Sequence, residues 1–144
     1  MFRALIKTMR PRQWTKNAFV LAALVFDRQL LNPVSLLRSI AGLILFCLLS
    51  SAVYIINDIV DVEADRQHPT KKNRPIASGK LPIPVAVGAI LLLLLVTFPL
   101  AYQLSPEFFL IAIFYFILNL AYSNWLKHIP LLDVLIIATG FVLR

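Results

Sequence analysis

The chain has 144 residues, of which 60% are hydrophobic and 15% are charged, and its mean hydropathy is +0.82. This composition excludes an ordinary soluble domain and predicts a protein embedded in the lipid bilayer. The net charge is +7, but the cations cluster between apolar runs and form no basic stripe with interleaved aromatic residues, so no nucleic-acid partner is expected.

The first sixteen residues carry five cations and no acid, so the positive-inside rule places the N-terminus on the cytoplasmic side. Apolar residues recur at helical spacing from Phe2 to Met9 and predict a short interfacial helix. Pro11 is expected to end this helix, and Trp14 is expected to lie at the level of the lipid headgroups.

Two membrane helices are predicted next. The first, over residues 17–31, is short and interrupted by Asp27 and Arg28, so we expect it to be tilted or partly shielded by protein. After a turn at Asn32-Pro33, Ser35 is expected to cap a second helix that continues through an acidic motif.

The acidic motif is NDIVDVEAD, residues 57–65. In a continuous helix with a turn of about 100° per residue, an amide and three carboxylates share one face, whereas Glu63 points away. Together they extend over about 12 Å, which suits one or two Mg²⁺ ions that bridge a diphosphate. The predicted metal ligands are Asn57, Asp58, Asp61 and Asp65.

Electrostatics favours a ligand at this motif. Carboxylates near a helix C-terminus face the negative end of the helix dipole and also repel one another, and divalent cations remove both penalties. A basic loop, residues 66–84, follows and is expected to face the cytoplasm. Its candidate phosphate-binding cations are Arg66, Lys71, Lys72 and Arg74. The alternative is a solvated membrane boundary without a ligand, which the one-sided spacing of the acids disfavours.

Three further apolar runs follow the basic loop. Residues 85–104 predict a third span with a kink at Pro99, and a turn with a capping Ser105 leads to a fourth span over residues 108–125. The fifth run begins near Pro130 and is shorter than the about 20 residues of a full span. We therefore expect an all-α, polytopic membrane helical bundle with four full transmembrane helices, the start of a fifth, and more sequence beyond it.

With its acidic motif on a second membrane helix, followed by HPTKKNRPIASG, the chain resembles the UbiA superfamily of intramembrane transferases over all 144 residues. The resemblance implies a fold of about nine membrane helices, of which residues 1–144 are the N-terminal part of a single domain. It also implies two aspartate-rich motifs that hold Mg²⁺ and a diphosphate-bearing donor. Only the first motif lies in this sequence, so we expect this part alone to be inactive.

The segments RPRQWTKN (residues 10–17) and YSNWLKHIPLLDVLIIATGFVLR (residues 122–144) are similar to the branch of decaprenyl-phosphate phosphoribosyltransferases. Aromatic prenyltransferases often carry a tyrosine and a lysine separated by three residues on the fourth helix, whereas Tyr122 and Lys127 are separated by four. The resemblance implies transfer of 5-phosphoribosyl from phosphoribosyl diphosphate to a polyprenyl phosphate.

Residue roles carry over from the matching motif positions. Asp58, Asp61 and Asp65 would be catalytic and, with Asn57, would hold the metal and the donor. The substrate-binding candidates are Asn57, Lys16, Asn17, Arg66, Lys71, Lys72, Arg74, Tyr122 and Lys127. Three alternatives remain: an aromatic prenyltransferase that uses a polyprenyl diphosphate, a membrane transporter with intramembrane acids, and a non-catalytic membrane protein.

Overall fold

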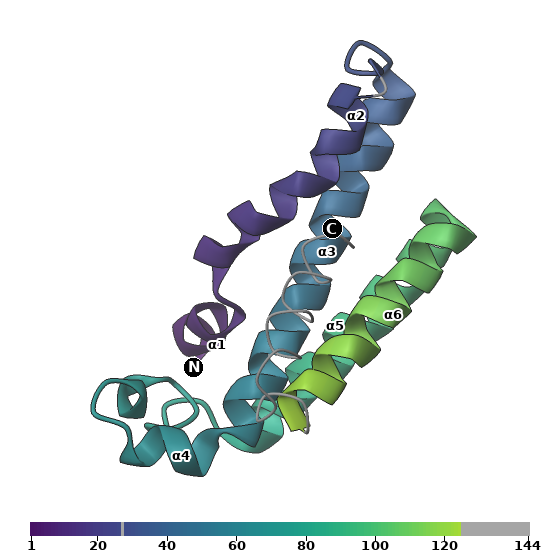
Figure 1. Cartoon of the computed structure of the whole chain (residues 1–144). Coiled ribbons are helices and arrows are strands. Elements are labelled where there is room, and N and C mark those ends of the chain that lie inside the picture. Colours follow the sequence, from purple (N-terminus) through teal and green to yellow (C-terminus); the bar gives the residue numbers. More distant parts are fainter. Residues whose placement is uncertain (27, 125–144) are drawn as a thin grey trace.

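The computed structural model describes residues 1–26 and 28–124, and this part of the chain is all-helical (Figure 1). The predicted all-α class is confirmed. The elements are α1 (Phe2–Met9), the 3₁₀ helix η1 (Pro11–Leu21), α2 (Ala22–Phe26), α3 (Pro33–Val60), α4 (Val62–Gln67), the 3₁₀ helix η2 (Lys71–Asn73), α5 (Ile83–Leu104) and α6 (Pro106–Asn124).

Three of the described helices, α3, α5 and α6, are long and apolar enough to cross a membrane. α5 and α6 correspond to the predicted third and fourth spans, and Pro99 lies inside α5. Ser105 caps α6, because its Oγ accepts a hydrogen bond from the backbone N–H of Phe108 at 3.3 Å. The predicted fifth run lies outside the described residues.

The predicted first span over residues 17–31 is wrong as a membrane-length α-helix. This region forms the end of η1 and the short α2, and the segment runs beside α3 in Figure 1. In a 3₁₀ helix, residues three apart lie on the same side. Trp14, Asn17 and Val20 have that spacing and all contact α3 or its core. Tertiary contacts with α3 therefore favour the 3₁₀ form here.

Trp14 is one of the η1 residues that contact α3. Its indole N–H donates to Ser51 Oγ on α3 at 3.0 Å, and the Ser51 hydroxyl lies within hydrogen-bond distance of the backbone oxygens of Cys47 (2.7 Å) and Met9 (3.2 Å). The expected anchor at the headgroup level is therefore a contact between η1 and α3. This contact holds the end of α1 against α3.

Both ends of α3 differ from the prediction. Asn32, not Ser35, caps its start, because the Asn32 side chain accepts from the backbone N–H groups of Val34 and Ser35. At the other end, Asp61 (φ −90°, ψ 7°) interrupts the helix between α3 and α4. The predicted continuous helix through residues 57–65 is therefore wrong, and α4 leaves the line of α3 (Figure 1).

Two apolar clusters hold the helices together. One joins α3 to α6 through Phe46, whose ring meets those of Phe108 and Tyr115 edge to face at 5.4 and 5.5 Å. The other joins α3 and α5 to the basic loop, because the buried loop residues Ile76 and Leu81 pack with Ile55. The second cluster fixes the loop against the end of α3 that carries the acidic motif.

Candidate functional site

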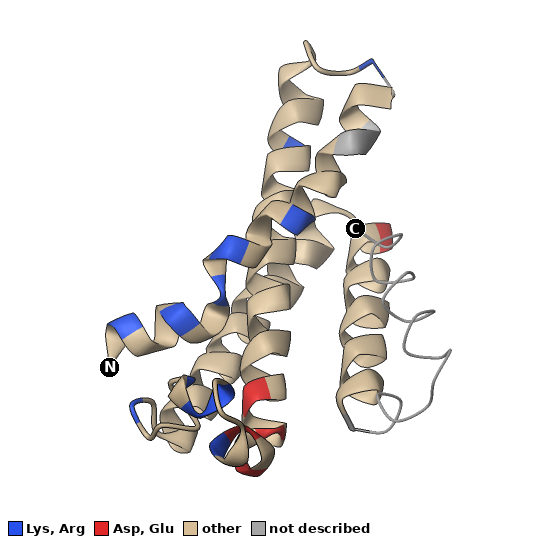
Figure 2. Cartoon of the chain, turned by 60° about the vertical axis from the view of Figure 1, so that its left-hand side comes forward, with Lys and Arg blue, Asp and Glu red and all other residues tan. Residues whose placement is uncertain are grey.

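The acids of residues 58–65 gather with cations of the basic loop at one end of α3, and the cationic α1 approaches the same region (Figure 2). Two of these acids, Asp58 and Asp65, are each only 2% exposed. A buried carboxylate is costly unless it is paired and hydrogen-bonded. The arrangement of cations around these two residues therefore defines the site.

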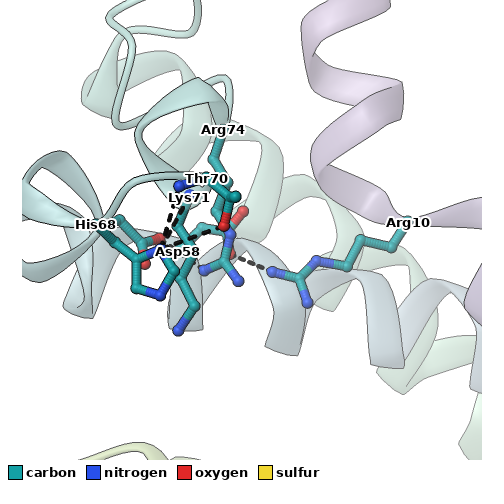
Figure 3. A network of polar contacts seen from close by, with 7 residues as sticks. Arg10, Asp58, His68, Thr70, Lys71 and Arg74 are labelled. Atoms are coloured by element: carbon teal, nitrogen blue, oxygen red, sulfur yellow. Dashed lines mark hydrogen bonds and ion pairs between the residues drawn. The ribbon is translucent and has the colours of Figure 1, made fainter.

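Asp58 lies in the last turns of α3, and one of its carboxylate oxygens accepts hydrogen bonds from two arginines. Arg10 donates from Nη2 to Asp58 Oδ1 at 2.5 Å, and Arg74 donates from Nη1 at 3.3 Å. Figure 3 shows Arg10 reaching Asp58 from the N-terminal segment and Arg74 from the basic loop. The Arg10 guanidinium also lies over the Tyr54 ring, 4.9 Å from its centroid, which restricts its position further.

Asp65 lies in α4 and shares Arg74 with Asp58. The same Nη1 atom of Arg74 donates to Asp65 Oδ2 at 2.6 Å. Arg74 is held in place because Pro75 and Ile76 directly after it are buried, and the backbone N–H of Leu81 returns to the oxygen of Pro75 at 2.9 Å. The buried loop residues thus place one cation between two acids that are seven residues apart.

The other two predicted metal ligands lie differently. Asn57 is oriented by α6, because its amide oxygen accepts a hydrogen bond from the buried hydroxyl of Ser123. Asp61 is half-buried at the junction of α3 and α4, and its backbone N–H donates to Asn57 O at 2.9 Å. Asn57 therefore faces a different helix from Asp58.

The remaining loop cations do not join the acidic pair. Arg66 turns outward to the exposed Glu63, with Nη1 to Oε1 at 2.7 Å, and its Nε donates to the oxygen of Ala77 at 3.4 Å. Lys71 and Lys72 are exposed on η2, where the backbone N–H of Lys71 donates to His68 Nδ1 at 3.4 Å. Their side chains are free to meet a ligand from solvent.

The two substrate-binding candidates that we expect at a polar entrance to the site, Lys16 and Asn17, lie in different surroundings. Lys16 is exposed, whereas Asn17 is buried and donates from Nδ2 to Ser50 Oγ at 3.1 Å and to Cys47 Sγ at 3.4 Å. Ser50 precedes Asp58 by eight residues, or about 12 Å along the helix axis, so Asn17 lies away from the acidic pair. Tyr122 lies half-buried on α6, and Lys127, the other predicted substrate-binding residue of this region, lies outside the described residues.

Sequence reasoning missed Arg10 and Ser123. The sequence predicts only a membrane-surface position for Arg10, although Arg10 is the first residue of the RPRQWTKN segment. Arg10 ends α1 in the left-handed conformation (φ 53°), which non-glycine residues seldom adopt. Only the fold brings it to Asp58, because 48 residues separate them in the sequence.

Comparison with known proteins gives the family. A profile described as the UbiA prenyltransferase family matches residues 17–144. The chain belongs to this family. With three apolar helices in residues 1–26 and 28–124, this member of the UbiA family is an integral membrane protein.

Relatives within the UbiA family agree with the predicted branch. The decaprenyl-phosphate phosphoribosyltransferase of Mycolicibacterium smegmatis is 40% identical over 97% of this chain and 45% of its own length. The protein of the same name from Corynebacterium glutamicum is 37% identical over 97% of this chain and 43% of its own length. The digeranylgeranylglyceryl phosphate synthase of Sulfurisphaera tokodaii is 32% identical over 71% of this chain and 36% of its own length. The chain thus spans less than half the length of these relatives.

The donor atoms of the acidic motif suit the magnesium ion that the UbiA family implies. All four predicted ligands offer oxygen, the atom that hard divalent cations prefer. Within residues 1–26 and 28–124, however, no three carboxylate, histidine or cysteine side chains are grouped closely enough to hold a metal. The oxygens of Asp58 and Asp65 contact arginines. A bound magnesium ion must therefore share these oxygens with the arginines or displace the arginines. The residue types fit the ion.

Proposed function

We propose that this protein acts in a magnesium-dependent transfer of 5-phosphoribosyl from phosphoribosyl diphosphate to a polyprenyl phosphate. The observation that carries the proposal is the buried pair Asp58 and Asp65 at the end of an apolar helix, bridged by Arg74. Acids this costly are expected where a charged ligand is bound. The two relatives that match nearly the whole chain are named decaprenyl-phosphate phosphoribosyltransferases, and this similarity supports the phosphoribosyl donor.

In this proposal, oxygens of Asn57, Asp58, Asp61 and Asp65 would hold Mg²⁺, which would supply positive charge to the diphosphate as a leaving group. An oxygen of the polyprenyl phosphate attacks the anomeric carbon, a new C–O bond forms, and the bond to the diphosphate breaks with its electron pair on the leaving group. Arg74 and Arg10 already contact the acids, so they are positioned to donate to phosphate oxygens of the donor that face the site. The work of the protein is positioning and charge neutralisation.

We further propose that α1 and the basic loop lie on the cytoplasmic side. Both are rich in cations, and both lie at the same end of α3 in Figure 2. Cytoplasmic segments carry an excess of lysine and arginine. A water-soluble donor would then reach the acidic motif from the cytoplasm, and the lipid acceptor would reach it from the bilayer.

The test uses membranes that contain the full-length protein, a polyprenyl phosphate, Mg²⁺, and either phosphoribosyl diphosphate labelled in the ribose or a labelled prenyl diphosphate. We expect ribose label in the lipid fraction, and loss of this transfer with EDTA and in Asp61→Ala. Transfer only from the prenyl diphosphate would identify a prenyltransferase instead. Transfer from neither donor would leave a transporter or a non-catalytic protein as the better interpretation.

A further inference from the structure

An open pocket of about 260 Å³ lies between α1 and the basic loop, beside the acidic pair. The pocket is lined by Pro75 and by six charged or polar residues, which are Lys7, Arg10, Asp58, Thr70, Asn73 and Arg74. Three of these residues are cations and one is a carboxylate. Two of the cations come from α1 and its cap, so the N-terminal segment does more than lie against the membrane.

Among the described residues, the carboxylates paired with this pocket do not balance its cations. Arg10 and Arg74 pair with Asp58 and Asp65, but no carboxylate among the described residues lies within ion-pair distance of Lys7. One positive charge is therefore in excess. If the acids also bind a divalent cation, as proposed above, the excess grows and an anion beside them becomes strongly favoured.

Both arginines retain free donors. A guanidinium carries five N–H groups in a planar fork. In the described structure, Arg10 uses Nη2 alone and Arg74 uses Nη1 alone for hydrogen bonds. Each can keep its carboxylate and still donate to a phosphate oxygen. The left-handed backbone of Arg10 and the Tyr54 ring hold its fork at the pocket.

We infer that Lys7, Arg10 and Arg74 form a subsite for a phosphate monoester, separate from the diphosphate at the acidic motif. This inference rests on the proposed function and specifies its donor. Phosphoribosyl diphosphate carries a second phosphate on the far side of its pentose, whereas a prenyl diphosphate carries none. The subsite therefore selects a sugar phosphate as the donor.

A polyprenyl phosphate is also a phosphate monoester, so the lipid acceptor is the other source of this chemistry. The pocket wall favours the soluble source. Apart from Pro75, its lining consists of charged or polar residues and offers no apolar wall for a prenyl chain. Thr70 and Asn73 add neutral hydrogen-bonding groups of the kind that a pentose hydroxyl needs.

Binding measurements on the protein in detergent, with ribose 5-phosphate as the probe, test the inference. Lys7→Ala is the sharpest variant, because Lys7 is exposed and its loss leaves no buried charge unpaired. We expect its affinity for ribose 5-phosphate to fall about tenfold or more. Arg12→Ala removes the same charge from an exposed position outside this pocket and should change the affinity less than about twofold. Both variants should keep the unfolding temperature of the parent protein.

Two parallel probes separate the possible failures. Farnesyl phosphate tests the lipid source, and a loss of its binding in Lys7→Ala with ribose 5-phosphate unaffected would overturn the assignment. Magnesium pyrophosphate tests the proposed function by itself, and Lys7→Ala should leave its affinity within about twofold. If pyrophosphate binds but ribose 5-phosphate does not, the subsite is wrong and the proposed metal site stands. If only ribose 5-phosphate binds, in a Lys7-dependent way, the subsite stands and the metal site fails.

Discussion

Arg10 donates from Nη2 to Oδ1 of Asp58 over 2.5 Å, although the two residues are 48 positions apart. This contact joins the cap of α1 to the buried end of α3. It makes the N-terminal segment part of the acidic site. Arg10 also has a left-handed backbone conformation, with φ at 53°.

The first prediction separates these two properties of Arg10. Arg10→Ala removes a short charged hydrogen bond from a buried carboxylate, so we expect a loss of about 2–3 kcal/mol in the free energy of unfolding. Arg10→Gly loses the same bond but accepts the left-handed conformation, and should be about 0.5–1 kcal/mol more stable than Arg10→Ala. Denaturant titration in detergent measures both. If alanine proved as stable as glycine, the backbone at Arg10 would not be strained.

The second prediction compares two loop arginines with different partners. Arg74→Ala leaves Asp65 buried without its 2.6 Å partner, and we expect a loss of about 2–3 kcal/mol in unfolding free energy. Arg66→Ala removes only the exposed pair with Glu63, and should change stability by less than about 0.5 kcal/mol. The same titration compares the two variants. Equal losses would show that Arg74 does not compensate a buried charge.

The third prediction concerns the metal. Asp61 lies half-buried at the junction of α3 and α4, whereas Glu63 is exposed and paired with Arg66. We expect Asp61→Asn to weaken magnesium-dependent pyrophosphate binding about tenfold or more, since it removes a negative oxygen ligand. Glu63→Gln should leave this affinity nearly unchanged. Calorimetry with and without EDTA gives the readout, and a larger effect at Glu63 would contradict the assigned ligand set.

The sequence predicted the features that depend on local composition. Long apolar runs identified α3, α5 and α6, and Ser105 was correctly assigned as a cap. The acidic motif and the basic loop were located because charge is rare in this chain. Each of these features is visible within one stretch of residues.

Features that depend on contacts between distant segments were not predictable from spacing. Asp61 interrupts the helix that the aspartate spacing assumed, so the acids are joined by Arg74 instead of by one helical face. Trp14 and Asn17 have side chains that suit a membrane surface or a polar entrance, but a 3₁₀ helix turns both toward α3. The role of Arg10 depends on how α1 docks, which no local pattern encodes.

The fourth prediction tests the two interpretations of Asn17. Asn17 Nδ2 bonds to Ser50 and Cys47, whereas its Oδ1 is buried without a hydrogen bond among the described residues. If Asn17 serves the contact with α3, Asn17→Ala should lower the unfolding free energy by about 1–2 kcal/mol and leave pyrophosphate affinity unchanged. An entrance role would give the opposite pattern, with weaker pyrophosphate binding at unchanged stability.

The fifth prediction concerns the close approach of η1, α3 and α6 at Gly42. A Cβ atom built there would lie 3.3 Å from Cε2 of Phe108 on α6 and 3.7 Å from Cγ1 of Val20 on η1. Gly42→Leu must push these neighbours apart, and overpacking of this kind costs about 1–3 kcal/mol. At Gly88 on α5, nothing lies within 4 Å of the added Cβ, so Gly88→Leu should be neutral or slightly stabilising because glycine is a poor helix former. Unfolding of the two variants in detergent gives the comparison, and equal stabilities would contradict close packing at Gly42.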